Sequence, residues 1–108
     1  MKIGEILKDA TTEGKEKHVP VIEKGTEGVT VIVGKETPHP NTMDHHIDWI
    51  KLVGVKEDGQ AVDLGNASFA PTYTSPTAVF RVNLEGVKTL YAMSYCNIHG
   101  LWESSLDL

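Results

Sequence analysis

Apolar residues recur along this chain in short runs that alternate with polar residues, and glycine or proline separates one run from the next. Alternation with a period of two places successive side chains on opposite faces, which is typical of β-strands. From residue 89 to 96, for example, Leu90, Ala92, Ser94 and Cys96 share one face. The pattern predicts strands at residues 21–23, 29–33, 47–55, 61–69, 78–84, 89–95 and 101–106.

The residues between these runs predict how the strands connect. The Asp-Gly pair at 58–59 predicts a hairpin turn, because glycine tolerates the positive φ that such turns require. Pro38 and Pro40 exclude a helix and predict a rigid loop over residues 34–43, and Gly-Asn at 65–66 predicts a bulge or turn. About seven short strands separated by turns indicate an all-β, immunoglobulin-like antiparallel β-sandwich with Greek-key connections.

Two further features complete the expected fold. Ile3, Ile6 and Leu7 have helical spacing and predict a short N-terminal helical turn docked on the body of the protein. The length of 108 residues, with 40% hydrophobic content, fits one compact domain over residues 1–108.

Charge and composition exclude several classes of protein. The formal net charge of −5 and the lack of an arginine and lysine cluster exclude a nucleic-acid partner, since phosphate binding needs a basic face. No apolar run approaches the roughly 20 residues of a membrane span, and the charged N-terminus does not resemble a signal peptide. One cysteine forms no internal disulfide, so we expect a cytoplasmic protein.

The candidate chemistry lies in one cysteine and in five histidines. A lone cysteine is most often a small buried apolar side chain, whereas a thiolate together with imidazoles suits a transition metal. Four imidazoles and a thiolate fill five positions of an octahedron and leave one open, while a closed zinc site uses four ligands, so the donor set favours iron. The residues concerned are Cys96, His18, His39, His45, His46 and His99.

Four separated motifs resemble the superoxide reductase (neelaredoxin) family. They are Glu-Lys-His-Val-Pro-Val-Ile-Glu at 16–23, Val-Gly-Lys-Glu-x-Pro-His-Pro-Asn at 33–41, His-His-Ile at 45–47, and Ser-Tyr-Cys-Asn-Ile-His-Gly-Leu-Trp at 94–102. The resemblance covers nearly the whole chain. Desulfoferrodoxins, the larger members, add an N-terminal rubredoxin-like iron domain with four cysteines, which this sequence lacks, so the chain resembles the single-iron class.

This resemblance implies an activity and a set of site residues. It implies one-electron reduction of superoxide to hydrogen peroxide, in defence against oxidative stress, at one mononuclear non-haem iron (Fe²⁺/Fe³⁺). It also implies Glu16 as a sixth ligand in the oxidised resting form, Lys17 beside the open position, and His46 as a residue that does not bind the metal. The implied protein ligands are four equatorial histidines and one axial cysteine: His18, His39, His45, His99 and Cys96.

The resemblance further implies rubredoxin as the external electron donor and a homo-oligomer, either a tetramer or a dimer. The residues themselves indicate two physical roles. Lys17 supplies a local cation for a small anion in an otherwise acidic protein. The thiolate of Cys96 pushes electron density onto the metal, and the backbone N–H groups of residues 97–99 are expected to donate hydrogen bonds to its sulfur.

Two other classes of protein remain open at the level of sequence. A blue-copper electron carrier is also a β-sandwich with a late cysteine, but it uses two histidines and an axial methionine, and Met93 is expected on the opposite strand face from Cys96. A non-catalytic interaction module would carry its histidines incidentally. Trp49, Phe80 and Trp102 are most simply core or interface aromatics.

Overall fold

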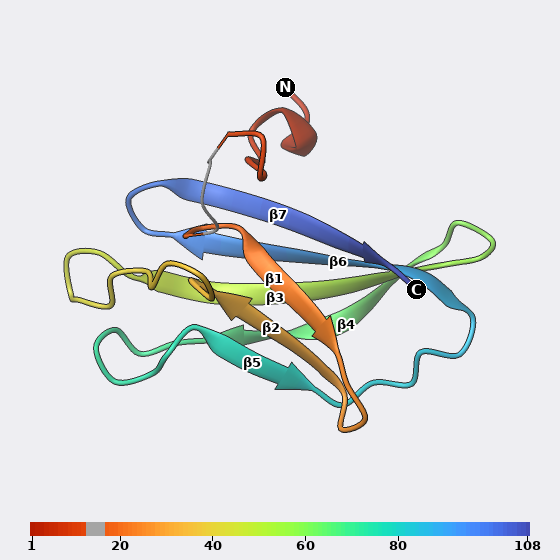
Figure 1. Ribbon diagram of the computed structural model, residues 1–108. Coiled ribbons are helices and arrows are strands. Elements are labelled where there is room, and N and C mark those ends of the chain that lie inside the picture. Colours follow the sequence, from red (N-terminus) through yellow and green to blue (C-terminus); the bar gives the residue numbers. More distant parts are fainter. Residues whose placement is uncertain (13–16) are drawn as a thin grey trace.

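The computed structural model describes residues 1–12 and 17–108, and within these ranges the chain forms seven strands and one 3-10 turn (Figure 1). The elements are η1 Ile3–Glu5, β1 Pro20–Lys24, β2 Val29–Val33, β3 Ile47–Lys56, β4 Ala61–Ser68, β5 Thr77–Phe80, β6 Val87–Cys96 and β7 Gly100–Asp107. None of the described residues belongs to a helix with the length and apolar character that crossing a membrane requires.

The strands form two antiparallel sheets, with the orders β1-β2-β5 and β4-β3-β6-β7. Strands distant in sequence, such as β2 and β5 or β3 and β6, are neighbours, so the chain crosses between the sheets as a Greek key requires. The expected immunoglobulin-like antiparallel β-sandwich is confirmed.

The core lies between the two sheets and is built from the inward-facing residues of the strands. Val29, Val31 and Val33 of β2 face Ile50 and Leu52 of β3, and all five are at most 3% exposed. The inward face of β6 is fully buried, as its alternation predicted, and consists of Leu90, Ala92, Ser94 and Cys96. Because Cys96 is the last residue of β6, this buried row ends in a thiol at one end of the sandwich.

The expected bulge is also present. The register between β3 and β4 shifts between Leu52 and Val53, whose partners are Gly65 and Asp63, so Leu64 is the extra residue. Gly65 has a φ of +124°, a conformation that favours glycine.

Two predictions of local structure were wrong in part. β5 ends at Phe80 rather than at residue 84, because its partner β2 begins opposite it at Val29 and the chain turns away before that residue. The expected N-terminal helical turn is present as η1, but Ile3 is 60% exposed and Ile6 is 42% exposed, and of its three apolar residues only Leu7 is half-buried. The segment attaches instead at Lys8, which forms a parallel bridge with Trp102 of β7.

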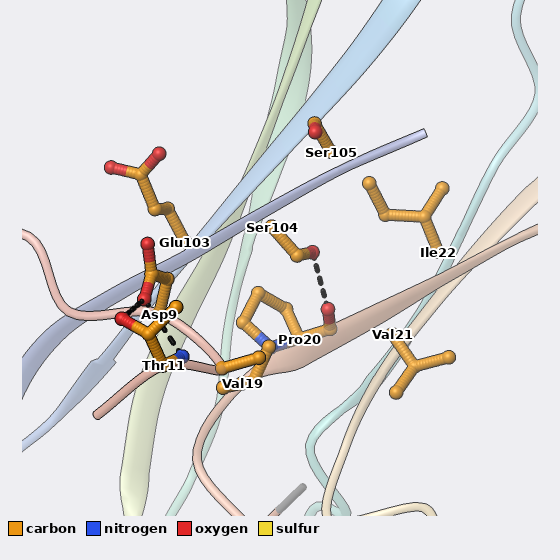
Figure 2. Close-up of a pocket in the computed structure, with 10 residues that line it drawn as sticks. Asp9, Thr11, Val19, Pro20, Val21, Ile22, Glu103, Ser104 and Ser105 are labelled. Atoms are coloured by element: carbon orange, nitrogen blue, oxygen red, sulfur yellow. Dashed lines mark hydrogen bonds between the residues drawn. The ribbon is translucent and has the colours of Figure 1, made fainter. Parts of the chain in front are cut away.

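A surface pocket of about 400 Å³ lies where this N-terminal segment meets β1 and β7 (Figure 2). Asp9 and Thr11 lie on one side of it, joined by hydrogen bonds from the backbone N–H and the hydroxyl of Thr11 to the Asp9 carboxylate. Ser104 of β7 donates a hydrogen bond to the carbonyl of Pro20 and links the edge strands of the two sheets. The N-terminal segment therefore packs against β7 and the start of β1.

Candidate metal centre

The candidate ligands come from four segments that meet at one end of the sandwich. In Figure 1 the start of β1, the loop between β2 and β3 and the turn between β6 and β7 all lie at the left end. His18 precedes β1, His39 and His45 lie in the β2–β3 loop, Cys96 ends β6, and His99 lies in the following turn.

Gly34 allows the β2–β3 loop to bring His39 to this point. Its φ is +85°, and a side-chain Cβ at this position would lie 2.6 Å from the backbone nitrogen of His39. A larger residue would therefore be strained and would also push His39 outward.

The side chains converge on one point. One ligand atom from each of His18, His39, His45 and Cys96 lies within 4.8 Å of the others. His99 lies beside this group, with its Nδ1 3.1 Å from Nε2 of His18 and 3.7 Å from the Cys96 sulfur. The sulfur is also 3.5 Å from Nε2 of His39. These five donors are the ones that the resemblance to the family implied as ligands.

The four imidazoles are arranged as the corners of a square. Neighbouring ring centroids are separated by 4.8 Å for His18 and His39, 4.7 Å for His39 and His45, 4.9 Å for His45 and His99, and 4.7 Å for His99 and His18. The diagonal from His18 to His45 is longer, at 6.3 Å. With metal–nitrogen bonds of about 2.1 Å, adjacent nitrogens of a square plane lie about 3 Å apart, which matches the His18–His99 pair.

The protonation of two rings fits metal binding. Nδ1 of His39 lies 2.7 Å from the carbonyl of Pro40 and donates to it, which leaves Nε2 unprotonated and facing the sulfur. Burial lowers the pKa of His39 from 6.5 to about 4. Burial and the neighbouring His99 lower the pKa of His45, so both rings are neutral at pH 7 and can bind a cation.

His45 provides the clearest sign of a missing partner. Its Nε2 is buried and has no hydrogen-bond partner among the described residues. A buried polar atom without a partner is destabilising, so such atoms are rare in proteins. A metal ion at the centre of the square would satisfy it, so the residues present fit an iron.

The Cys96 thiol is fully buried and accepts a hydrogen bond from the backbone N–H of His99, with a nitrogen–sulfur distance of 3.4 Å. The prediction for Asn97 was wrong: its backbone N–H donates to the carbonyl of His46, at 3.2 Å, and not to the sulfur. The turn after Cys96 aims this N–H at the neighbouring loop instead.

The side chain of Asn97 is a site residue that sequence reasoning missed. Its Oδ1 accepts from the backbone N–H of His46 at 2.9 Å, and its Nδ2 donates to the carbonyl of Asp44 at 3.0 Å. It therefore holds the backbone on both sides of His45 against the turn that follows Cys96. Its place directly after the cysteine was the available signal.

His46 points away from the cluster of ligand atoms. Its Nδ1 lies 2.9 Å from the carbonyl of Thr42, and its Nε2 lies 2.8 Å from the carboxylate of Asp48. These contacts occupy both ring nitrogens and fix the loop that carries His45.

Trp102 has a more specific place than the expected core or interface position. It is 4% exposed, and its ring stacks on His18 with the centroids 4.8 Å apart and the planes at 12°. Its indole N–H also donates to the carbonyl of His99, at 3.2 Å. It thus contacts two of the four imidazole residues.

The remaining candidates are Lys17, Glu16 and Met93. Lys17 is half-buried next to His18, and its charge contributes to lowering the pKa values of His39 and His45, which places it near the cluster. Glu16 lies outside the described residues. Met93 lines a surface pocket with Trp49, away from the inward face that carries Cys96, so it does not supply the axial ligand of a blue-copper site.

Comparison with known proteins gives a consistent result. A family model described as desulfoferrodoxin matches residues 10–105. The chain is 49% identical over 114 aligned positions to the superoxide reductase of Pyrococcus abyssi, covering 95% of this chain and 99% of that protein. It is 40% identical over 110 positions to the neelaredoxin of Megalodesulfovibrio gigas, covering 83% and 85%.

Solved structures agree with the sequence comparison. A superoxide reductase (neelaredoxin) from Archaeoglobus fulgidus in the reduced form superposes with a TM-score of 0.81 at 44% identity, covering 88% of this chain and 90% of that one. The family model, the relatives and the fold all agree, and the chain therefore belongs to the desulfoferrodoxin family, together with the proteins named superoxide reductase and neelaredoxin.

Proposed function

We propose that this chain is a superoxide reductase that converts superoxide to hydrogen peroxide with one electron and two protons, at a mononuclear non-haem iron. The observation that carries the proposal is the square of four imidazoles beside a buried thiol. The similarity to proteins named superoxide reductase, at up to 49% identity, supports the same activity.

The residues that would hold the iron are four imidazoles and one thiol: His18, His39, His45, His99 and Cys96. The bound iron would supply the electron that superoxide takes up. The Cys96 sulfur lies 3.5 Å from Nε2 of His39 and 3.7 Å from Nδ1 of His99, which supports its role as a ligand beside the imidazoles. The N–H of His99 donates to this sulfur and moderates the electron density that the thiolate gives to the metal.

Lys17 and Glu16 have distinct proposed roles. Lys17 attracts the substrate anion over about one Debye length, roughly 8 Å at physiological salt, and hydrogen-bonds a water that donates a proton. Its electrostatic influence on His39 and His45 supports this position. Glu16 is proposed to occupy the sixth position in the oxidised resting protein; its place in the sequence motif supports this role.

Each turnover consumes one electron, so an external donor is required. We propose rubredoxin as that donor, and a homo-oligomeric, cytoplasmic protein, because the motifs at residues 16–23, 33–41, 45–47 and 94–102 resemble those of the single-iron class.

The test is to mix the reduced, iron-loaded protein with superoxide while oxygen and peroxide are both measured. A reductase yields one hydrogen peroxide per superoxide and no dioxygen, whereas a dismutase yields dioxygen as well. Stoichiometric dioxygen, or a protein that binds no iron, would contradict the proposal.

A further inference from the structure

The N-terminal segment brings a second lysine to the metal centre. The backbone N–H of Lys8 donates to the carbonyl of Leu101 at 3.0 Å, and the backbone N–H of Glu103 donates to the carbonyl of Lys8 at 2.8 Å. These two bonds flank the parallel bridge between Lys8 and Trp102. The Lys8 backbone is therefore fixed against β7, although its side chain is exposed.

The ammonium of Lys8 reaches the turn that carries His99. Its Nζ donates to the carbonyl oxygen of His99 at 3.0 Å and lies 5.4 Å from the centroid of the Trp102 ring. The second distance is within the range of a cation–π interaction. Because Trp102 donates to the same carbonyl, that oxygen accepts one charged and one neutral hydrogen bond.

Lys8 and Trp102 together support two adjacent corners of the ring square. Trp102 stacks on His18, and both Lys8 and Trp102 hold the backbone of His99. The rings of His18 and His99 are neighbours, 4.7 Å apart. The side chains of Lys8 and Trp102 thus support two of the four imidazole residues.

The charge of Lys8 lies close to the proposed metal centre. The chain has a net charge of −5, and the Lys8 ammonium hydrogen-bonds the backbone carbonyl of His99, whose ring faces the cluster of ligand atoms. A nearby positive charge disfavours the more positive oxidation state of a bound ion.

We propose that Lys8 is a positioning residue of the metal centre, which together with Trp102 orients His18 and His99 and, through its charge, raises the reduction potential of the bound iron. The inference rests on the proposed iron centre and is independent of which substrate the iron reduces. The proposed role of Lys8 is distinct from that of Lys17, because the Lys8 ammonium hydrogen-bonds a backbone carbonyl and does not need to contact the substrate.

Three substitutions separate the hydrogen bond from the charge. Lys8→Met removes both, Lys8→Gln can still donate to the His99 carbonyl without a charge, and Lys8→Arg retains both. Lys88→Met is the matched control, because Lys88 is an exposed lysine near the start of β6, the end of that strand opposite Cys96. Circular dichroism and iron content establish that each variant is folded and loaded.

The first readout is the midpoint potential of the iron, measured by redox titration of the visible absorption. We expect a lower potential for Lys8→Met and Lys8→Gln and a value near wild type for Lys8→Arg and Lys88→Met. The second readout is tryptophan emission of the metal-free protein. It should shift in Lys8→Met and Lys8→Gln, because both variants remove the charge near the Trp102 ring, and should stay near wild type in Lys8→Arg and Lys88→Met.

Each outcome has a defined meaning. A midpoint potential and emission in Lys8→Met equal to those of Lys88→Met would overturn the inference. A Lys8→Arg potential as low as that of Lys8→Met would overturn the role of the charge. Iron-loaded wild-type protein that fails to reduce superoxide, with the Lys8 shifts still present, would instead contradict the proposed function and leave this inference standing.

Discussion

The substitution Asn97→Ala tests whether the turn after Cys96 and the loop that carries His45 are held as one unit. Asn97 makes two side-chain hydrogen bonds to that loop, at 2.9 Å to the N–H of His46 and at 3.0 Å to the carbonyl of Asp44. Alanine removes both and keeps the backbone bond from residue 97 to His46.

The size of the effect follows from these contacts. A hydrogen bond contributes about 0.5–1.5 kcal/mol net, and a buried donor left without a partner costs about 1–3 kcal/mol. The residue that loses its acceptor, His46, is 8% exposed. The Asp44 carbonyl is in an exposed residue, so water can replace that bond. We therefore expect a loss of about 2 kcal/mol in the free energy of unfolding.

The assay is urea unfolding of the metal-free and the iron-loaded protein. A loss of 2 kcal/mol moves the midpoint by about 1 M urea, because small proteins have slopes of about 1–3 kcal/mol per molar. The matched control is Asn83→Ala, which removes a single bond, from the N–H of Glu85 at 3.0 Å, in an exposed turn. The loss in Asn97→Ala should exceed that of the control and should grow with iron bound, because His45 is a proposed ligand. Equal losses in the two variants, with equal retention of iron, would refute the reasoning.

Three further predictions concern the centre itself. Cys96→Ser should lose the visible thiolate-to-iron absorption band; a surviving band would mean that another side chain is axial. Lys17→Ala should keep its iron but react more slowly with superoxide in pulse radiolysis, while Lys24→Ala, an exposed control in β1, should not; equal rates would remove Lys17 from the mechanism. In the metal-free protein, His39 has a pKa of about 4 when folded against 6.5 for the free side chain. The unfolded chain then binds more protons between these values, so stability should fall by at most about 3 kcal/mol as the pH drops from 6.5 to 4. Melting temperatures of chelator-treated protein that stay constant across this range would contradict the shift.

Alternation along the sequence was sufficient to predict most of the fold. It located β2 at its observed bounds and identified the buried row of β6 that ends in Cys96, because a period of two directly reports which face is buried. It failed after Phe80, where residues 81–84 keep alternating but no strand of the described chain lies beside them. A strand needs a partner, and periodicity within one segment does not reveal where the partner ends.

The candidate ligands were accessible from sequence through the motifs that resemble the superoxide reductase family, because residue type alone marks Cys96 and five histidines and does not set His46 apart. Their supporting contacts were not. Asn97 and His46 are 51 residues apart, and Lys8 and His99 are 91 apart. No local spacing relates such pairs, so their contacts emerge only when the sheets have formed.

The sequence by itself therefore determined most of the strands, the buried face of β6 and the residue types of the candidate donors, because each depends on residue type or on spacing over a few positions. The tertiary structure alone decided that the four rings form a square, that Trp102 stacks on His18, and that Lys8 and Asn97 brace the turn after Cys96. The physical reason is that these are long-range contacts, whose geometry depends on the order and register of strands in two packed sheets.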